Sequence, residues 1–157
     1  MRNATKTVKP PPVLAGCRVI EYALRDRSVK YSGRSHLFYG GKEVGPVSRL
    51  AIGRDNERGA LVLHCSRTWN VLGIARHAGI KEAKRRAERI YPGLSAKWLK
   101  TGVSKRQAKA YLDKALKGVE CSFCGKRPDQ IDQMVSKGNA RICNVCVRDI
   151  AAMMSIE

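Results

Sequence analysis

Cys121-Ser122-Phe123-Cys124 is separated by eighteen residues from Cys143-Asn144-Val145-Cys146, and these two pairs decide the fold of the C-terminal part of the chain. Such pairs are typical of a structural zinc site, because each can hold one side of a tetrahedral ion at about 2.3 Å Zn–S. Gly125, directly after the first pair, accepts the positive φ of a tight turn whose N–H groups point at the sulfurs. The sequence therefore predicts one structural Zn²⁺ per chain, held by Cys121, Cys124, Cys143 and Cys146.

The alternatives to zinc binding are that these cysteines form disulfide bonds or are free, buried thiols. Disulfides are expected in exported chains, whereas the first six residues carry no apolar stretch typical of a signal peptide. No apolar run approaches the roughly eighteen residues or more of a membrane span. Zinc is therefore favoured, and the protein is expected in the cytoplasm without a membrane partner.

The cysteine pairs, with Gly125-Lys126 after the first and Ile142 and Val147 flanking the second, closely resemble the N-terminal C4 zinc-binding domain of the ClpX unfoldase family. The resemblance covers residues 119–151. It implies a small treble-clef-like module that forms dimers and binds substrate and adaptor polypeptides, with the four cysteines as zinc ligands.

Two features depart from that family. The family usually has acidic residues between the second pair of cysteines, where this chain has Asn144 and Val145. No G-x-x-x-x-G-K-[ST] phosphate loop occurs in the chain, so the resemblance does not imply an AAA+ ATPase. Residues 17–99 are reminiscent of small bacterial or phage accessory proteins but resemble no named family.

Positive charge is concentrated outside the cysteine module. Residues 1–118 contain 26 Lys and Arg against 8 Asp and Glu, whereas residues 119–157 contain 5 against 5. The chain of 157 residues has material for one ordinary core, and the module at 119–157 is too small to be stable without its ion. This asymmetry predicts a basic domain that meets an acidic partner.

The sequence indicates an α+β fold: an antiparallel β-meander covered by two helices, plus a small C-terminal treble-clef-like zinc module with four cysteine ligands at 119–157. Residues 1–13 read as a disordered basic arm, and residues 14–118 as the basic α+β domain. The first helix has an apolar stripe at Ile80, Ala83, Ala87 and Ile90. The second begins at Ser104 and is expected to bury Ala108, Tyr111, Leu112, Ala115 and Leu116, with the domain boundary at Gly118. Five or six short strands are expected: the first from about Cys17 to Leu24, continued by 29–31, and the others at 36–39, 42–44, 47–52, 60–65 and 69–74.

The two helical segments carry most of the candidate contacts with a partner. Residues 76–117 contain 13 Lys and Arg against 3 acidic residues, with few acids placed to balance them. Such a surface either contacts phosphates or an acidic protein, or is simply solvated. The candidate contact residues are Lys81, Lys84, Arg85, Arg86, Arg89, Lys105, Arg106 and Lys109.

Other candidates are weaker. His36, His64 and His77 would form a site only if folding brought them together, and Cys17 and Cys65 are expected to be buried thiols. The aromatic residues that could stack on bases, but are more often core, are Phe38, Tyr39, Trp69 and Trp98. No acid pair, nucleophile motif or phosphate loop indicates an enzyme.

Two functions are open. The first is a non-enzymatic interaction protein in which the zinc module mediates homodimerisation or polypeptide binding, as an adaptor, regulator or toxin-immunity protein. The alternative is a DNA- or RNA-binding protein that uses the basic helical face of residues 76–117.

Overall fold

The computed structural model describes residues 9–54 and 59–155. The chain forms two compact units, one up to Ala108 and the other from Lys109. The division falls inside helix α2 (Lys105–Ala115), whereas the sequence placed the boundary at Gly118. Most of the expected disordered arm lies outside the described residues, and Val13 at its end already belongs to strand β1.

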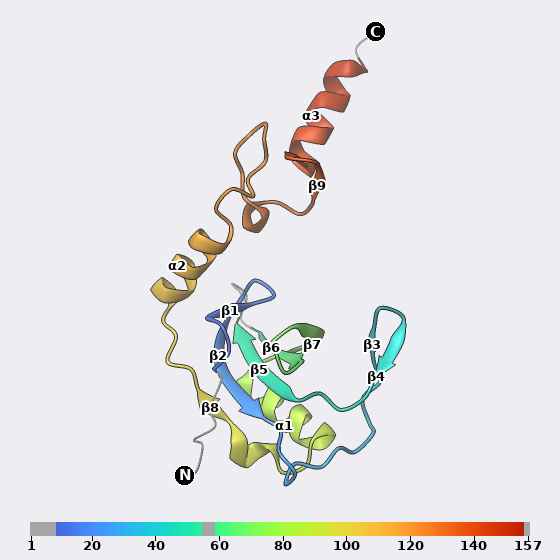
Figure 1. Ribbon diagram of the computed structural model, residues 1–157, viewed down its shortest axis with the longest axis vertical. Helices are drawn as coiled ribbons and strands as arrows, with labels where there is room; N and C mark the ends of the chain where they lie inside the picture. The colour runs from blue at the N-terminus through green and yellow to red at the C-terminus, as the bar shows by residue number, and fades with distance from the viewer. Residues whose placement is uncertain (1–8, 55–58, 156–157) are drawn as a thin grey trace. The chain divides into compact units, whose positions relative to one another are not determined.

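An antiparallel sheet forms the N-terminal unit (Figure 1). Its strands follow the order β1-β2-β5-β6-β7, with β8 on β2, which confirms the predicted antiparallel sheet. The strands are β1 (Val13–Leu14), β2 (Cys17–Leu24), β5 (Arg49–Arg54), β6 (Ala60–Cys65), β7 (Val71–His77) and β8 (Leu99–Lys100). Residues 29–31 form no strand. β7 begins later than expected, because Trp69 has a φ of 65° and takes part in the turn between β6 and β7.

Both faces of the sheet are packed. Ala60, Val62 and His64 alternate along β6 with Leu61, Leu63 and Cys65, and all six residues are buried. One face packs against helix α1 (Ile80–Ile90) through Ala83 and Ala87, as the apolar stripe predicts. Trp98 packs against this cluster too. The opposite face carries a second cluster, whose largest members are Tyr22, Leu63 and Trp69.

A separate hairpin, β3 (Leu37–Tyr39) and β4 (Lys42–Val44), lies between β2 and β5 in sequence. Gly40 and Gly41 form its turn with φ of 58° and 77°, as expected for a two-glycine turn. Phe38 and Tyr39 are 62% and 57% exposed, so they do not belong to the core. Leu37 packs over Gly73 of β7, where any added side chain would collide with it.

Helix α2 differs from the expectation that five of its apolar residues are buried. Ala108 is buried, but Tyr111 and Ala115 are exposed, and Leu112 and Leu116 are half-buried. Its beginning is as predicted, because the backbone N–H of Gln107 donates to Ser104 Oγ at 3.1 Å and that of Ser104 donates to Gln107 Oε1 at 2.8 Å. Among the described residues, no helix is both long and apolar enough to cross a membrane.

Glu88 of α1 organises the turn that follows the helix. Its carboxylate accepts hydrogen bonds from Gly93 N at 2.7 Å, Ser95 N at 2.6 Å and Ser95 Oγ at 2.8 Å. Partial burial alone would raise the pKa of Glu88, but these donors outweigh it and lower the pKa. The charged form is therefore favoured in the folded protein.

We expect Glu88→Gln to lower the free energy of unfolding at pH 7 and to leave it closer to wild type at acid pH. The pKa of Glu88 is lower in the folded protein than in the unfolded chain, where a glutamate titrates at about 4.3. The charged carboxylate therefore stabilises the fold above that pH, and this contribution is lost as the pH falls through the pKa of the folded protein. Urea unfolding of both proteins between pH 3 and pH 7 measures the difference, with Lys81→Gln, an exposed position on the same helix, as the control. A pH-independent difference would show that the charge of Glu88 contributes nothing.

Candidate metal centre

The four predicted cysteines meet at one point in the C-terminal unit. Their sulfur atoms all lie within 4.8 Å of one another, with Cys121 Sγ 3.8 Å from Cys146 Sγ and Cys124 Sγ 3.7 Å from Cys143 Sγ. Sulfurs at the corners of a tetrahedron with Zn–S of about 2.3 Å stand about 3.8 Å apart, whereas a disulfide requires about 2.05 Å. The arrangement fits a Zn²⁺ ion and does not fit disulfide bonds.

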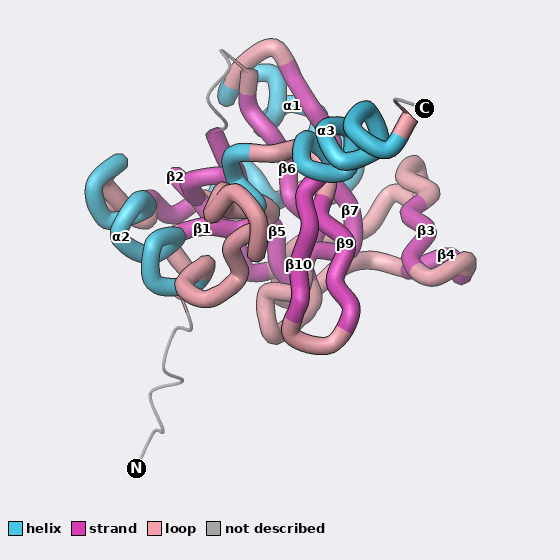
Figure 2. Tube along the Cα trace, turned by 90° about the horizontal axis from the view of Figure 1, so that it is seen from above, coloured by secondary structure: helices cyan, strands magenta, loops and turns pink. Residues whose placement is uncertain are grey.

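Two backbone structures place the sulfurs. The first pair lies in a knuckle, in which Gly125 has a φ of 71° and donates its N–H to Cys121 O at 2.9 Å. The second pair joins the β9–β10 hairpin (Met134–Lys137, Ala140–Cys143) to helix α3 (Asn144–Met154), as Figure 2 shows. Cys143 ends β10 and caps α3, and Cys146 lies in the first helical turn. Knuckle, hairpin and helix follow one another as in a treble clef.

Backbone N–H groups stabilise thiolate at the site. Cys143 N donates to Cys121 Sγ, and Cys146 N donates to Cys143 Sγ, each at 3.4 Å. The pKa of Cys121 is lowered to about 6, chiefly by the backbone N–H of Cys124 and further by those of Phe123 and Cys143. Zinc binds the thiolate, so the polypeptide prepares this ligand for the metal.

The metal centre is also the core of its unit. Cys121, Cys143 and Cys146 are its buried residues, while Cys124 is exposed. Four half-buried apolar side chains pack around them: Ile131, Met134, Ile142 and Val145. So little apolar surface is a weak driving force for folding, and the metal has to supply the rest.

Arg127 connects α2 to the knuckle, a role that the sequence analysis missed. Its guanidinium pairs with Asp113 of α2 at 2.5 Å and with Asp129 at 2.8 Å. These bonds raise the pKa of Arg127 and lower that of Asp113. The second half of α2 therefore belongs to the zinc-binding unit. The sequence contained one hint, an acidic residue within an otherwise basic helix.

The predicted basic contact residues are not equivalent in the structure. Lys84 pairs with Glu21 at 2.5 Å and lies over the Trp98 ring, Arg85 and Arg86 approach Glu82 at 3.8 and 3.9 Å, and Lys109 pairs with Asp113 at 2.9 Å. Acidic residues thus balance more of these charges than the sequence suggested. Four of the eight are exposed and have no ion pair within the described part of the chain: Lys81, Arg89, Lys105 and Arg106.

The histidines do not form a metal site with the cysteines. His36 pairs with Glu43 on the β3–β4 hairpin at 2.8 Å, whereas His64 and His77 line a groove beside α1. Cys17 and Cys65 are buried, as expected, and burial raises the pKa of Cys65 to about 12. Among the described residues, only the four C-terminal cysteines are grouped as metal ligands.

We expect protein purified without chelator to contain about one zinc per chain, and Cys143→Ser to lose most of it. A structural zinc contributes on the order of 10–16 kcal/mol, so the variant should also lose the hydrogen-exchange protection of residues 119–155. Elemental analysis and exchange mass spectrometry measure the two effects. Cys65→Ala, which removes a buried thiol outside the site, is the control and should keep its zinc. Near-zero metal in the wild type would contradict the assignment.

Comparison with known proteins agrees with this geometry. Residues 119–155 match the family of ClpX C4-type zinc fingers. No curated protein and no solved structure matches the chain. The C-terminal segment of this protein, residues 119–155, is a ClpX-type C4 zinc finger.

Proposed function

We propose that the protein is a non-enzymatic interaction protein whose zinc finger binds a second copy of itself. The observation that carries this proposal is the amount of apolar side chain exposed on so small a unit. Exposed large apolar residues mark interaction surfaces when they cluster. On the finger they are Phe123 (65%), Val135 (64%), Val147 (44%), Met153 (66%) and Met154 (79%).

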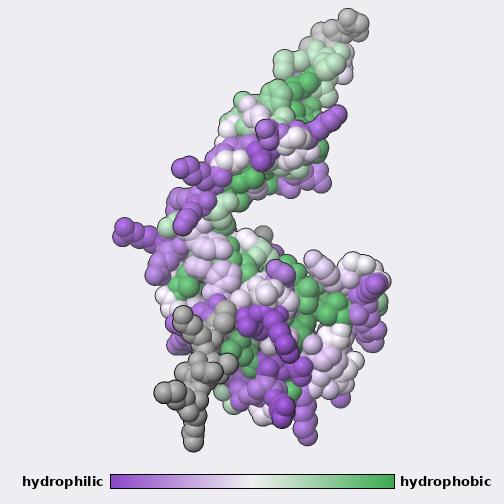
Figure 3. All heavy atoms as spheres, viewed as in Figure 1, coloured by the Kyte–Doolittle hydropathy of each residue, from purple (hydrophilic) through white to green (hydrophobic). Residues whose placement is uncertain are grey.

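Part of this surface is concave. Val135 of β9, Ile142 of β10 and Val147 of α3 line a depression of about 400 Å³, together with the polar residues Gln133, Asn144 and Arg148. Apolar residues also cover much of α3 in Figure 3. Protein interfaces likewise combine apolar side chains with polar ones.

The charge of the finger permits self-association. Residues 119–157 contain 5 basic and 5 acidic residues, and four thiolates on one Zn²⁺ would add a net charge of only about −2, so two zinc-loaded fingers would repel one another weakly. Asn144 and Val145, which stand where ClpX fingers usually carry acids, keep the start of α3 uncharged. A symmetric dimer would place the same apolar patch against itself.

A finger that pairs two chains would present two basic domains to a partner. This arrangement suits an adaptor, a regulator or a toxin-immunity protein, and an acidic polypeptide is the partner that the excess of positive charge favours. Thiols and zinc thiolates persist in reducing compartments, so we place the protein in the cytoplasm.

We expect Val135→Glu combined with Val147→Glu to weaken the dimer at least tenfold while leaving zinc content unchanged. Both side chains are exposed in the single chain, so the charges disrupt only an apolar contact between chains. Sedimentation equilibrium measures the dissociation constant. Ser136→Glu, on the opposite face of β9, is the matched control. A wild-type protein that stays monomeric at about 100 µM would refute self-association.

Nucleic-acid binding is the second candidate, and the specific observation in its favour is the unpaired charge on α1. Lys81 and Arg89 are exposed without an acidic partner in the described part of the chain, and Arg85 makes only a 3.8 Å contact with Glu82. Phosphates attract such side chains and release counterions on binding.

We expect charge reversal at Lys81, Arg85 and Arg89 to remove binding to duplex DNA or structured RNA, if this candidate is correct. The wild-type log–log salt slope should approach one unit for each phosphate contacted. Fluorescence anisotropy at low and physiological salt gives both quantities. The control is the finger variant that combines Val135→Glu with Val147→Glu. Each of its chains should bind nucleic acid with the affinity of a single wild-type chain. Binding that is equally strong in the charge-reversal variant would exclude α1 as the contact.

A further inference from the structure

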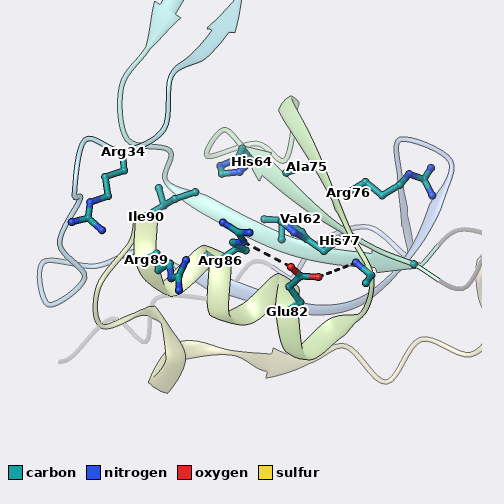
Figure 4. Close-up of a pocket in the computed structure, with 13 residues that line it drawn as sticks. Arg34, Val62, His64, Ala75, Arg76, His77, Glu82, Arg86, Arg89 and Ile90 are labelled. Atoms are coloured by element: carbon teal, nitrogen blue, oxygen red, sulfur yellow. Dashed lines mark hydrogen bonds and ion pairs between the residues drawn. The ribbon is translucent and has the colours of Figure 1, made fainter.

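A groove of about 870 Å³ lies in the N-terminal unit, between α1 and strands β6 and β7. Figure 4 shows its side chains: Arg86 extends from α1 toward Val62 and His77, and Arg34 and Arg89 lie beside Ile90. The apolar part of the lining is formed by Val62, Ala75, Ala87 and Ile90. A groove of this size matches the pockets that hold small molecules, which measure roughly 300–1,000 Å³.

The end of the groove near Ile90 is positively charged. Ser32 N donates to Ile90 O at 2.9 Å, and this bond brings the loop that carries Arg34 to the last turn of α1, where Arg89 lies. Neither guanidinium has an acidic partner in the described part of the chain. Two arginines from different segments, Arg34 and Arg89, therefore line the groove near Ile90.

The acidic residue of the groove lies at the other end. Glu82 belongs to the first turn of α1, where its carboxylate accepts a hydrogen bond from Ala78 N at 3.3 Å and approaches Arg85 and Arg86 (Figure 4). Its charge is thus already partly compensated. An anion at the Ile90 end would meet arginine without meeting a carboxylate.

His64 adds a polar group to the wall. It is 5% exposed, and its Nδ1 has no hydrogen-bond partner among the described residues. Burial, with a smaller effect of the neighbouring His77, lowers the pKa of His64 to about 4. A neutral imidazole with a buried, unpaired nitrogen offers a hydrogen bond rather than a charge, and leaving that bond unmade costs stability.

His64 also lies close to the charged end. It faces the same side of β6 as Val62, and its ring is 6.2 Å from that of Tyr91, the residue directly after α1. Its neighbour on β7 is Gly73, and Leu37 packs over that glycine, so apolar surface continues past the histidine. One end of the groove thus combines two cations, a neutral hydrogen-bonding ring and an apolar wall.

We propose that this groove binds a nucleotide-sized organic phosphate, with the phosphate on Arg34 and Arg89 and the ring system on the apolar wall beside His64. Two guanidinium groups match the double charge of a phosphate monoester better than the single charge of a carboxylate. Inorganic phosphate would leave the apolar wall and His64 uncovered. The site lies in a different unit from the zinc finger and is independent of finger-mediated dimerisation.

The test is calorimetric titration of the zinc-loaded, full-length protein with AMP, inorganic phosphate and adenosine. We expect AMP to bind saturably. Phosphate and adenosine should bind at least tenfold more weakly, because phosphate would contact only the arginines and adenosine only the apolar wall and His64. Arg34→Ala and Arg89→Ala should each weaken AMP binding about tenfold, the usual effect of removing one charged hydrogen bond. Arg67→Ala, an exposed arginine in the turn between β6 and β7, is the matched control and should change nothing.

The histidine is tested without a substitution in the core. AMP should shift the imidazole resonances of His64 in NMR spectra, whereas His36, whose side chain is 75% exposed on the β3–β4 hairpin, should not respond. Three outcomes would overturn the proposal: no saturable AMP binding at about 10 mM, binding by both arginine variants as strong as that of the wild type, or an unshifted His64.

Discussion

Burial of β6 on both faces is the constraint on which the N-terminal unit depends. Alternation along a strand sends successive side chains to opposite sides, so six consecutive buried residues require packing on each. Ala83 and Ala87 of α1 supply one layer, and their small side chains let the helix approach closely. His64 faces this layer although it is polar. The groove beside α1 is therefore a product of the same packing that stabilises the sheet.

The C-terminal unit is stabilised in a different way. Its buried residues are three cysteines, and the apolar side chains around them are only half-buried. Where the sheet unit gains stability from area removed from water, the finger gains it from four bonds to one ion. The two units therefore respond to different perturbations: a core substitution affects the first, and loss of metal affects the second.

Local patterns predicted most of the fold. The cysteine spacing, the stripe on α1 and the Gly40-Gly41 turn are each encoded within a few neighbouring residues, and each appears as expected. The partition of α2 could not be predicted, because it depends on a pairing between Asp113 and Arg127, fourteen residues apart in sequence. Apolar spacing alone suggested a wider buried face than the helix has, because Tyr111 and Ala115 are exposed.

The groove was invisible in the sequence for a similar reason. Arg34 and Arg89 line the same groove because contacts of residues 30–32 with the end of α1, such as the hydrogen bond from Ser32 N to Ile90 O, hold the loop of Arg34 there. Charge counting along the helices selected Lys84, Arg86 and Arg89 alike. Folding pairs Lys84 with Glu21 and Arg86 with Glu82, and leaves Arg89 without an acidic partner among the described residues. An acidic partner within the fold thus decides whether a basic side chain is available to a ligand.

Cys124 is exposed, whereas the other three candidate zinc ligands are buried. The affinity of the centre for zinc and the rate at which zinc would exchange therefore depend on different features. Affinity depends on all four sulfurs together. In a zinc-loaded centre, an incoming thiol or chelator would reach Cys124 before the three buried sulfurs. Zinc held tightly at equilibrium would therefore still be open to ligand replacement from one side of the centre.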